Sequence, residues 1–310
     1  MNNKKKFETR AIHVGQKPEK LYGSVSLPIY QTSTFKQEEF GEYKYDYSRA
    51  GNPTRTALEQ NIASLEDGED AAMFGSGMAA MSAIFTLLGS GDHVIISGNV
   101  YGGTYRLMTK IMENMGLCAS WVDTSVASNI KNYIKQETRM VIVESPTNPM
   151  MQLTDIENVS DIAKEFNLIL VVDNTFMSPY FQRPLTLGAD LVMHSTTKYI
   201  NGHSDVIGGV VAGRDPKIME QLHFIQMSVG AVPGPFDCWL TQRAIKTLPV
   251  RMEAHNKNAM RLASQLEGSE KFKNVYYPGL KSHPHFELAT KQQLSPHGKP
   301  GYGGMISIEL

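Results

Sequence analysis

Residues 154–173, TDIENVSDIAKEFNLILVVD, join a helical pattern directly to a buried strand. Apolar residues recur at helical spacing from Ile156 to Phe166, and Thr154 with Glu157 forms a capping box that predicts where the helix begins. The uninterrupted apolar run from Leu168 to Val172 then predicts a strand that is buried on both faces. This succession of elements is typical of an α/β protein built on a parallel sheet.

The same alternation of strand and helix extends along the chain in both directions. Asn52-Pro53 marks a helix start, because Asn accepts hydrogen bonds from the first backbone N–H groups of a helix and Pro suits the first turn. We therefore expect a mostly parallel sheet with helices on both faces. Besides residues 168–172, the predicted strands are residues 71–74, 93–96, 121–122, 140–143, 191–193 and 206–212.

Three regions of the chain differ in pattern. Residues 1–50 lack strong periodicity and are expected to form an N-terminal arm. Residues 51–249 carry the strand and helix alternation of one large domain. Residues 250–310 contain two strand-like runs, Val275–Tyr277 and Met305–Ile308, and are expected to form part of an α+β C-terminal domain. Because the sequence ends beside an apolar strand whose partners would follow it, we expect this domain to be incomplete.

The composition argues against several classes of protein. A formal net charge of −1 over 310 residues gives no basic field for nucleic acid or for an anionic membrane surface. No apolar stretch approaches the ~20 residues that a membrane helix needs. The N-terminus also lacks the apolar segment of a secretory signal. We therefore expect a cytoplasmic protein that binds neither nucleic acid nor membrane.

Cysteine and histidine residues give no sign of a metal site. Cys118 and Cys238 are too few and too far apart for a disulfide framework or a zinc knuckle, and we expect both to be reduced and buried. His283-Pro284-His285 has no further Cys, His or carboxylate at metal-ligand spacing. We expect no bound metal.

Three predicted strands are followed by residues that could bind a ligand or take part in a reaction. Ligands of open α/β sheets bind beyond the carboxyl ends of the strands. Gly75-Ser76-Gly77 follows one strand and opens a helix, an arrangement that favours a phosphate, although it is also an ordinary tight turn. Asp173 ends a second strand, where a carboxylate needs a partner such as a cap, an Arg, a metal or a protonated ring nitrogen.

The third strand end leads through Ser195 and Thr197 to Lys198. A lysine that acts as a nucleophile must spend time neutral, and burial or nearby positive charge lowers its pKa. A surface lysine in a Ser/Thr loop is the plainer alternative. Together, the three ends supply a phosphate site, a ring-nitrogen carboxylate and an amine, which are the partners that pyridoxal phosphate needs.

Six segments of the chain resemble the Cys/Met metabolism family of pyridoxal-phosphate enzymes, and they occur in the family's order. The segments are YSRAGNPTR at 47–55, GSGMAA at 75–80, YGGT at 101–104, SPTNP at 145–149, VDNTF at 172–176 and STTKY at 195–199. The resemblance implies an aspartate-aminotransferase-like fold, fold type I. It also implies that the large domain at 51–249 binds pyridoxal 5'-phosphate.

The resemblance also implies roles for individual residues. Lys198 would form the Schiff base with the cofactor, Asp173 would pair with its ring nitrogen, and Tyr101 would stack on the ring. Asn148 would contact the ring hydroxyl or the substrate carboxylate. Lys198, Tyr101 and Asp173 would be the catalytic residues. The phosphate would be bound by Ser76, Gly77, Met78, Ser195 and Thr197, and by Tyr47 and Arg49 reaching across from the neighbouring subunit.

These roles imply a homodimer or homotetramer with shared active sites, and a sulfur amino acid as the small-molecule substrate. The activity implied is transsulfuration in cysteine and methionine metabolism and amino-acid biosynthesis. Family members continue several tens of residues past Leu310, and that part would complete the C-terminal domain. We therefore also consider an inactive pyridoxal-phosphate-binding fragment or assembly partner.

Individual positions bear on which family member the chain resembles. Gly102 and Gly103 stand where methionine γ-lyases usually carry a Cys, which argues against that enzyme. The stretch 277–285 favours cystathionine γ-lyase, whereas Asp46 favours cystathionine γ-synthase. We expect γ-elimination of L-cystathionine to cysteine, 2-oxobutanoate and ammonia. The alternative is a γ-synthase that acts on an O-acylhomoserine and cysteine.

Overall fold

The computed structural model describes residues 5–37, 39, 41 and 43–310. They divide into two compact units, which are treated separately below. Unit 1 lies within residues 1–87 and 194–248, and unit 2 comprises residues 88–193 and 249–310. The expected arm, large domain and incomplete C-terminal domain remain predictions.

The strands follow the order β1-β7-β6-β5-β4-β2-β3. Neighbours among β2 to β6 pair in parallel, whereas β1 and β7 pair antiparallel. The strands are β1 (Asp70–Phe74), β2 (His93–Ser97), β3 (Cys118–Val122), β4 (Thr138–Glu144), β5 (Ile169–Asp173), β6 (Leu191–Ser195) and β7 (Gly209–Gly213). Each predicted strand is therefore present, and the sheet is mostly parallel, as expected for an α/β protein.

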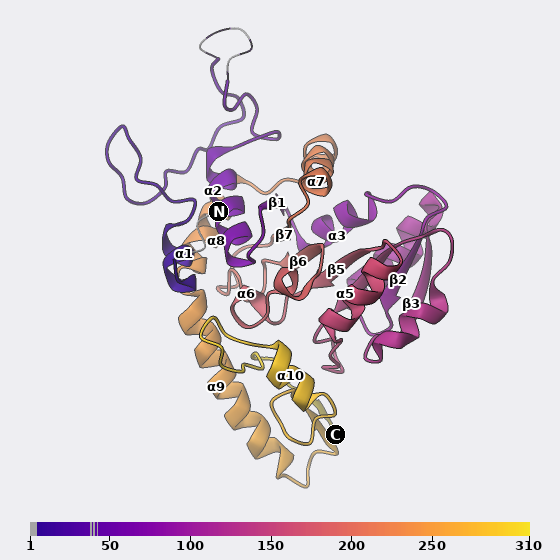
Figure 1. Ribbon diagram of the computed structural model, residues 1–310. Helices are drawn as coiled ribbons and strands as arrows, with labels where there is room; N and C mark the ends of the chain where they lie inside the picture. Colours follow the sequence, from indigo (N-terminus) through magenta and orange to yellow (C-terminus); the bar gives the residue numbers. More distant parts are fainter. Residues whose placement is uncertain (1–4, 38, 40, 42) are drawn as a thin grey trace. The chain divides into compact units, whose positions relative to one another are not determined.

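Unit 1 is built around β1, β7 and the helix that follows the Asn52-Pro53 signal. Asn52 caps α2 by accepting a hydrogen bond from the backbone N–H of Thr54, and Leu58 and Ile62 are fully buried on its inner face. The helices of this unit are α1 (Phe7–His13), α2 (Pro53–Leu65), α3 (Gly77–Phe85), α7 (Pro216–Val229) and α8 (Pro235–Ile245) (Figure 1). The sequence pattern did not predict α1.

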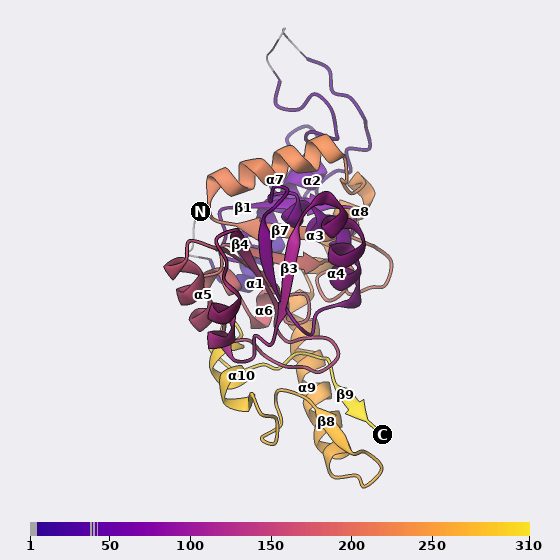
Figure 2. The ribbon, with the colours of Figure 1, turned by 90° about the vertical axis from the view of Figure 1, so that its right-hand side faces the viewer.

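Unit 2 holds the parallel strands β2, β3, β4 and β5 and the start of β6. Figure 2 shows α4 (Gly102–Leu107) and α5 (Ile156–Glu165) on opposite faces of these strands. Ile156 and Val159 of α5 pack in one buried cluster with apolar residues of β2, β4 and β5. Helices on both faces explain why these strands are apolar throughout.

The remaining elements of unit 2 are short turns and the segment after α8. They are a π-helix, η1 (Met108–Met112), and the 3₁₀ turns η2 (Glu113–Met115), η3 (Ala127–Tyr133) and η4 (Pro184–Leu187), with α6 (Ser178–Phe181), α9 (Leu248–Glu267) and α10 (Phe286–Gln292). The strands β8 (Asn274–Tyr276) and β9 (Ser307–Glu309) pair antiparallel, as the two strand-like runs suggested. None of the helices in the described residues is long and apolar enough to cross a bilayer.

Two expectations from the sequence were wrong. Asp155, not Thr154, caps α5 by accepting a hydrogen bond from the backbone N–H of Asn158 at 3.0 Å, while the Thr154 hydroxyl bonds to Thr124 at 2.7 Å. Cys118 is exposed, although Cys238 is buried as expected. Cys118 begins β3, which is the last strand in the order and has only one neighbour.

Candidate functional site

In unit 1, the ends of β1 and β6 meet at Gly77 and Ser195. Ser76 caps α3 by accepting a hydrogen bond from the backbone N–H of Ala79 at 3.0 Å, so the chain turns from β1 into the helix within two residues. A Cβ atom on Gly77 would lie 2.8 Å from Cβ of Ser195. Only glycine permits this approach, which places the first turn of α3, where Met78 follows Gly77, against the Ser195 hydroxyl.

Lys198 lies in a turn that hydrogen bonds hold in place. Its backbone N–H donates to Ser195 at 3.2 Å, and its carbonyl accepts from Gly202 at 2.7 Å. The Thr197 hydroxyl bonds to the backbone of Gly208, accepting from its N–H at 3.1 Å. The Lys198 side chain itself is exposed. The structure thus brings Ser76, Gly77, Met78, Ser195, Thr197 and Lys198 together.

A buried hydrogen bond between His194 and Glu66 anchors the strand that leads to Lys198. Nε2 of His194 lies 2.5 Å from Oε1 of Glu66, and both side chains are completely buried. Glu66 is the C-cap residue of α2. The last turn of α2 is therefore tied to the end of β6 at His194, four residues before Lys198.

Tyr47 and Arg49 lie together on the exposed surface of unit 1. The Arg49 guanidinium stacks 5.5 Å from the centre of the Tyr47 ring, and Nη1 of Arg49 donates to the carbonyl of Met227. Arg55, which is buried, donates to the carbonyls of Ser48 and Ala50 at 2.9 Å each. The start of α2 thus fixes the loop that presents these two side chains.

In unit 2, Asp173 stands at the end of β5. Its Oδ1 accepts from the backbone N–H and the hydroxyl of Thr175, at 3.0 and 2.6 Å. The side chain is 9% exposed. The carboxylate is therefore oriented by its own turn and is nearly shielded from solvent.

Tyr101 and Asn148 are joined by a residue that the sequence analysis missed. Glu144, at the end of β4, accepts from the backbone N–H of Tyr101 at 2.7 Å with Oε2 and from that of Asn148 at 3.0 Å with Oε1. It is in register with Asp173 of the neighbouring strand. A carboxylate directly after the apolar run 140–143 was the signal that could have identified it, as it identified Asp173.

Glu144 is costly to ionise in this position. Burial raises the pKa of its carboxyl group well above the usual value, and the negative charge of Asp173 raises it further. The backbone hydrogen bonds from Tyr101 and Asn148 act in the opposite direction and favour the ionised form. Two strand-end carboxylates therefore interact within unit 2.

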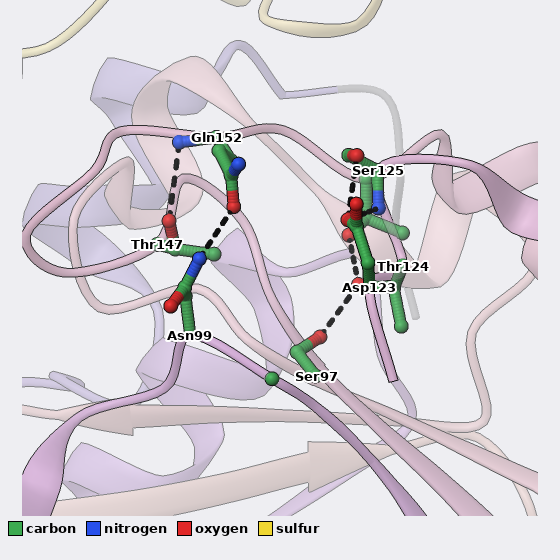
Figure 3. A pocket seen from close by; sticks show the side chains of 9 residues that line it. Ser97, Asn99, Asp123, Thr124, Ser125, Thr147 and Gln152 are labelled. Carbon is green, nitrogen blue, oxygen red and sulfur yellow. Dashed lines mark hydrogen bonds between the residues drawn. The ribbon is translucent and has the colours of Figure 1, made fainter. Parts of the chain in front are cut away.

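A polar pocket of about 150 Å³ lies beyond the ends of β2, β3 and β4 (Figure 3). The hydroxyls of Ser97, Thr124 and Thr154 form a chain with 2.7 Å between neighbours. Across the pocket, Asn99 donates to Gln152 at 2.7 Å. The lining is Ser97, Gly98, Asn99, Asp123, Thr124, Ser125, Thr147, Gln152 and Thr154, so the pocket adjoins Tyr101 and Asn148 in sequence without including them.

The chain matches known proteins over almost its whole length. The family model described as Cys/Met metabolism PLP-dependent enzyme matches residues 8–310. Cystathionine gamma-lyase of Bacillus subtilis (strain 168) is 49% identical over 98% of this chain and 79% of its own length. Cystathionine beta-lyase of Lactococcus lactis subsp. cremoris (strain MG1363) is 48% identical with the same coverage. A probable cystathionine gamma-synthase of Herpetosiphon aurantiacus is also 48% identical, over 98% of this chain and 94% of its own length.

Two crystal structures share the fold. The metB structure from Corynebacterium glutamicum has a TM-score of 0.95 and 46% identity over 99% of this chain and 79% of its own. Cystathionine gamma-lyase from Lactobacillus plantarum, complexed with L-serine, has the same TM-score and 42% identity with the same coverage. At these identities the likeness extends beyond the fold to the sequence.

The residues of each unit fit the cofactor that the family description implies. Unit 1 offers a helix N-terminus brought against a hydroxyl by the absence of a side chain at Gly77, which suits a phosphate group. It also offers the exposed amine of Lys198 in the same turn. Unit 2 offers the oriented carboxylate of Asp173 for a ring nitrogen and the half-exposed ring of Tyr101 for stacking.

Proposed function

Because the chain belongs to the Cys/Met metabolism PLP-dependent enzymes, we propose that it is a transsulfuration enzyme that cleaves L-cystathionine by γ-elimination. The products are cysteine, 2-oxobutanoate and ammonia, and one water is consumed. The observation that carries the proposal is the turn at Lys198, where an exposed amine follows the Gly77–Ser195 contact that suits a phosphate. Similarity to two γ-lyases supports the choice of reaction.

In this proposal the residues of unit 1 anchor the cofactor. Lys198 carries it on its side-chain amine. Ser76, Gly77, Met78, Ser195 and Thr197 bind the phosphate through hydroxyls and the first turn of α3. The Glu66–His194 pair keeps the end of β6 in place, so the amine and the phosphate donors keep a fixed spacing.

The residues of unit 2 act on the ring. Pyridoxal phosphate, when bound, supplies an electron sink that stabilises negative charge on the substrate carbons. Asp173 holds a proton at the ring nitrogen, and Tyr101 covers the ring face while its phenol is available for proton transfer. Asn148 binds the ring hydroxyl or the substrate carboxylate.

Proton transfer at the substrate is the task of Lys198. With the cofactor bound, its amine would take one proton at a time from Cα and Cβ of the substrate and would give a proton to Cγ after the Cγ–S bond has broken. General acid–base catalysis of this kind contributes about 10²–10⁴-fold to a rate. The cysteine thiolate that leaves takes up a proton.

A γ-synthase is the second candidate. The 48% identity to a probable γ-synthase and the residue type at Asp46 favour it. The Asp46 carboxylate accepts a hydrogen bond from the backbone N–H of Tyr47 at 2.7 Å. That contact places a carboxylate beside the Tyr47–Arg49 surface, where it suits a substrate amino group. An inactive cofactor-binding fragment or assembly partner is the third.

We further propose a homodimer or homotetramer in which Tyr47 and Arg49 complete the phosphate site of the neighbouring subunit. Both side chains are exposed within one chain, and Arg is suited to bidentate contact with phosphate. A cytoplasmic location is part of the same proposal.

The first experiment tests the cofactor. Purified protein reconstituted with pyridoxal phosphate should be coloured, and Lys198→Ala should lose the visible absorption band. Lys217→Ala, which removes an exposed lysine of α7, is the matched control and should keep it. A colourless wild-type protein would disprove the proposal.

Product assays then separate the reactions. From L-cystathionine, a γ-lyase releases 2-oxobutanoate, whereas a β-lyase releases pyruvate and homocysteine. A γ-synthase forms cystathionine from an O-acylhomoserine and cysteine. A coloured protein that is inert in every assay would establish the fragment or assembly partner instead.

A further inference from the structure

Glu144 connects two loops that carry proposed cofactor contacts. One carboxylate oxygen accepts from the backbone N–H of Tyr101 and the other from that of Asn148, at 2.7 and 3.0 Å. A carboxyl group offers two oxygens, so it can accept from two backbone N–H groups at once. The two N–H groups belong to loops that follow different strands, β2 and β4, so a single side chain sets the spacing between them.

The outer side of the same two loops is joined at the polar pocket. Figure 3 shows Asn99, two residues before Tyr101, donating to Gln152 at 2.7 Å. The Gln152 backbone N–H donates in turn to the hydroxyl of Thr147, the residue before Asn148, at 3.1 Å. With Glu144 on the inner side, each loop is fixed at two points, and the loops can shift only together.

This arrangement is not explained by stability alone. Glu144 is 7% exposed, and burying an ionisable group is unfavourable unless its partners compensate. Burial and the charge of Asp173 raise the pKa of Glu144. A neutral residue of similar size at this position would avoid the free-energy cost of burying an ionisable group. The hydrogen bonds from the backbone N–H groups of Tyr101 and Asn148 offset this cost.

We propose that Glu144 is a positioning residue, which holds the Tyr101 ring and the Asn148 amide in register for the bound cofactor. This inference rests on the proposed function, because it assigns Glu144 a role through two proposed cofactor contacts. Its task is to keep the spacing of the two loops constant, so that stacking and the amide contact are made at the same time.

Glu144→Gln tests the inference, since an amide can accept from only one of the two N–H groups and presents an NH₂ group to the other. We expect pyridoxal phosphate to bind about tenfold more weakly, the order expected when a buried donor loses its acceptor. We also expect an altered visible circular dichroism band, which reports the orientation of the bound ring. The unfolding midpoint of the cofactor-free protein should change little, because the lost hydrogen bond is offset by the removal of a buried ionisable group.

Glu165→Gln is the matched control, because Glu165 is an exposed residue of the same unit, paired with Lys131 at the surface. It should leave cofactor affinity and the dichroism band unchanged. If Glu144→Gln does not fold, Glu144→Asp makes the same test, since it keeps the charge but shortens the reach to the two loops. It should weaken cofactor binding and alter the band in the same direction.

The outcomes separate this inference from the proposed function. Wild-type protein that binds no pyridoxal phosphate overturns both. Wild-type protein that binds it, with a Glu144 variant that matches the Glu165 control in affinity and dichroism, overturns the positioning role alone. A Glu144 variant that loses stability in proportion to cofactor affinity, with an unaltered dichroism band, also overturns it, because that pattern indicates a purely structural residue.

Discussion

At the scale of single residues, buried and half-buried polar side chains repeatedly fix the backbone at or beside a proposed site residue. Arg55 bonds to the carbonyls beside Arg49, Thr197 bonds to Gly208, and Glu144 bonds to the N–H of Tyr101. A buried polar group needs such partners, and a backbone partner ties the position of the main chain to that of the side chain. The site residues themselves can then remain exposed, as Lys198 and Tyr101 are.

His283 gives a pH-dependent prediction at this scale. Burial, with a smaller effect of neighbouring His285, lowers the pKa of His283 from 6.5 to about 4. Its Nδ1 accepts from the backbone N–H of His285 at 3.2 Å, a bond that protonation at Nδ1 would break. Between pH 6.5 and 4 the unfolded chain therefore binds a proton that the folded chain excludes, and stability falls as the pH falls through this window.

Replacing His283 should remove this dependence. His283→Gln keeps an acceptor but does not titrate, so the stability lost between pH 7 and pH 5 should shrink by about 1 kcal/mol, after allowance for solvent screening. Urea unfolding at both pH values, at one protein concentration, measures the difference. His13→Gln at an exposed position is the control, and an equal change in both variants would contradict the prediction.

At the scale of elements, α5 shows why a helix could be predicted more reliably than its cap. The stripe from Ile156 to Phe166 follows from burial against the sheet, which the sequence pattern reports directly. The cap depends on where the preceding loop places its side chains. Thr154 is drawn into the hydroxyl chain at Thr124, and Asp155 takes the capping position instead.

Removing this cap should destabilise the protein. Asp155→Ala deprives the Asn158 N–H of its acceptor and should lower the free energy of unfolding by about 1 kcal/mol. Asp155→Asn is the matched control, because Asn caps helices about as well as Asp. Denaturant unfolding of the cofactor-free protein measures both. Equal losses in the two variants would show that the charge of Asp155, not its hydrogen bond, stabilises α5.

The strands illustrate the same limit for the site. The apolar runs predicted each strand of the sheet, and Asp173 and Lys198 stood out because a charged residue followed such a run. Glu144 also follows an apolar run, but the sequence analysis assigned no cofactor contact to a carboxylate at that position. Its role depends on the N–H groups of Tyr101 and Asn148. Tyr101 is 43 residues away in the sequence, and a contact over that separation produces no local sequence pattern.

At the scale of the whole molecule, we proposed that the loop with Tyr47 and Arg49 contacts the cofactor phosphate of a neighbouring subunit. Within the chain, Arg49 bonds to the Met227 carbonyl and stacks on Tyr47, so the pair is ordered before any partner arrives. An ordered pair loses less conformational freedom on association than a mobile one. The loop is therefore suited to reach a neighbouring subunit's phosphate in a symmetric dimer.

Mixed dimers test this sharing of sites. Lys198→Ala alone should be inactive, and Arg49→Ala alone should bind the cofactor phosphate weakly. In a dimer of one Lys198→Ala and one Arg49→Ala chain, one site carries both changes and the other carries neither, so random assembly of equal amounts should restore about a quarter of the wild-type activity. Co-expression with different affinity tags isolates the mixed dimer, which should have about half the wild-type activity per dimer. If Arg49 instead served the site of its own chain, every site in the mixed dimer would carry one change, and its activity would not exceed the mean of the two parent variants.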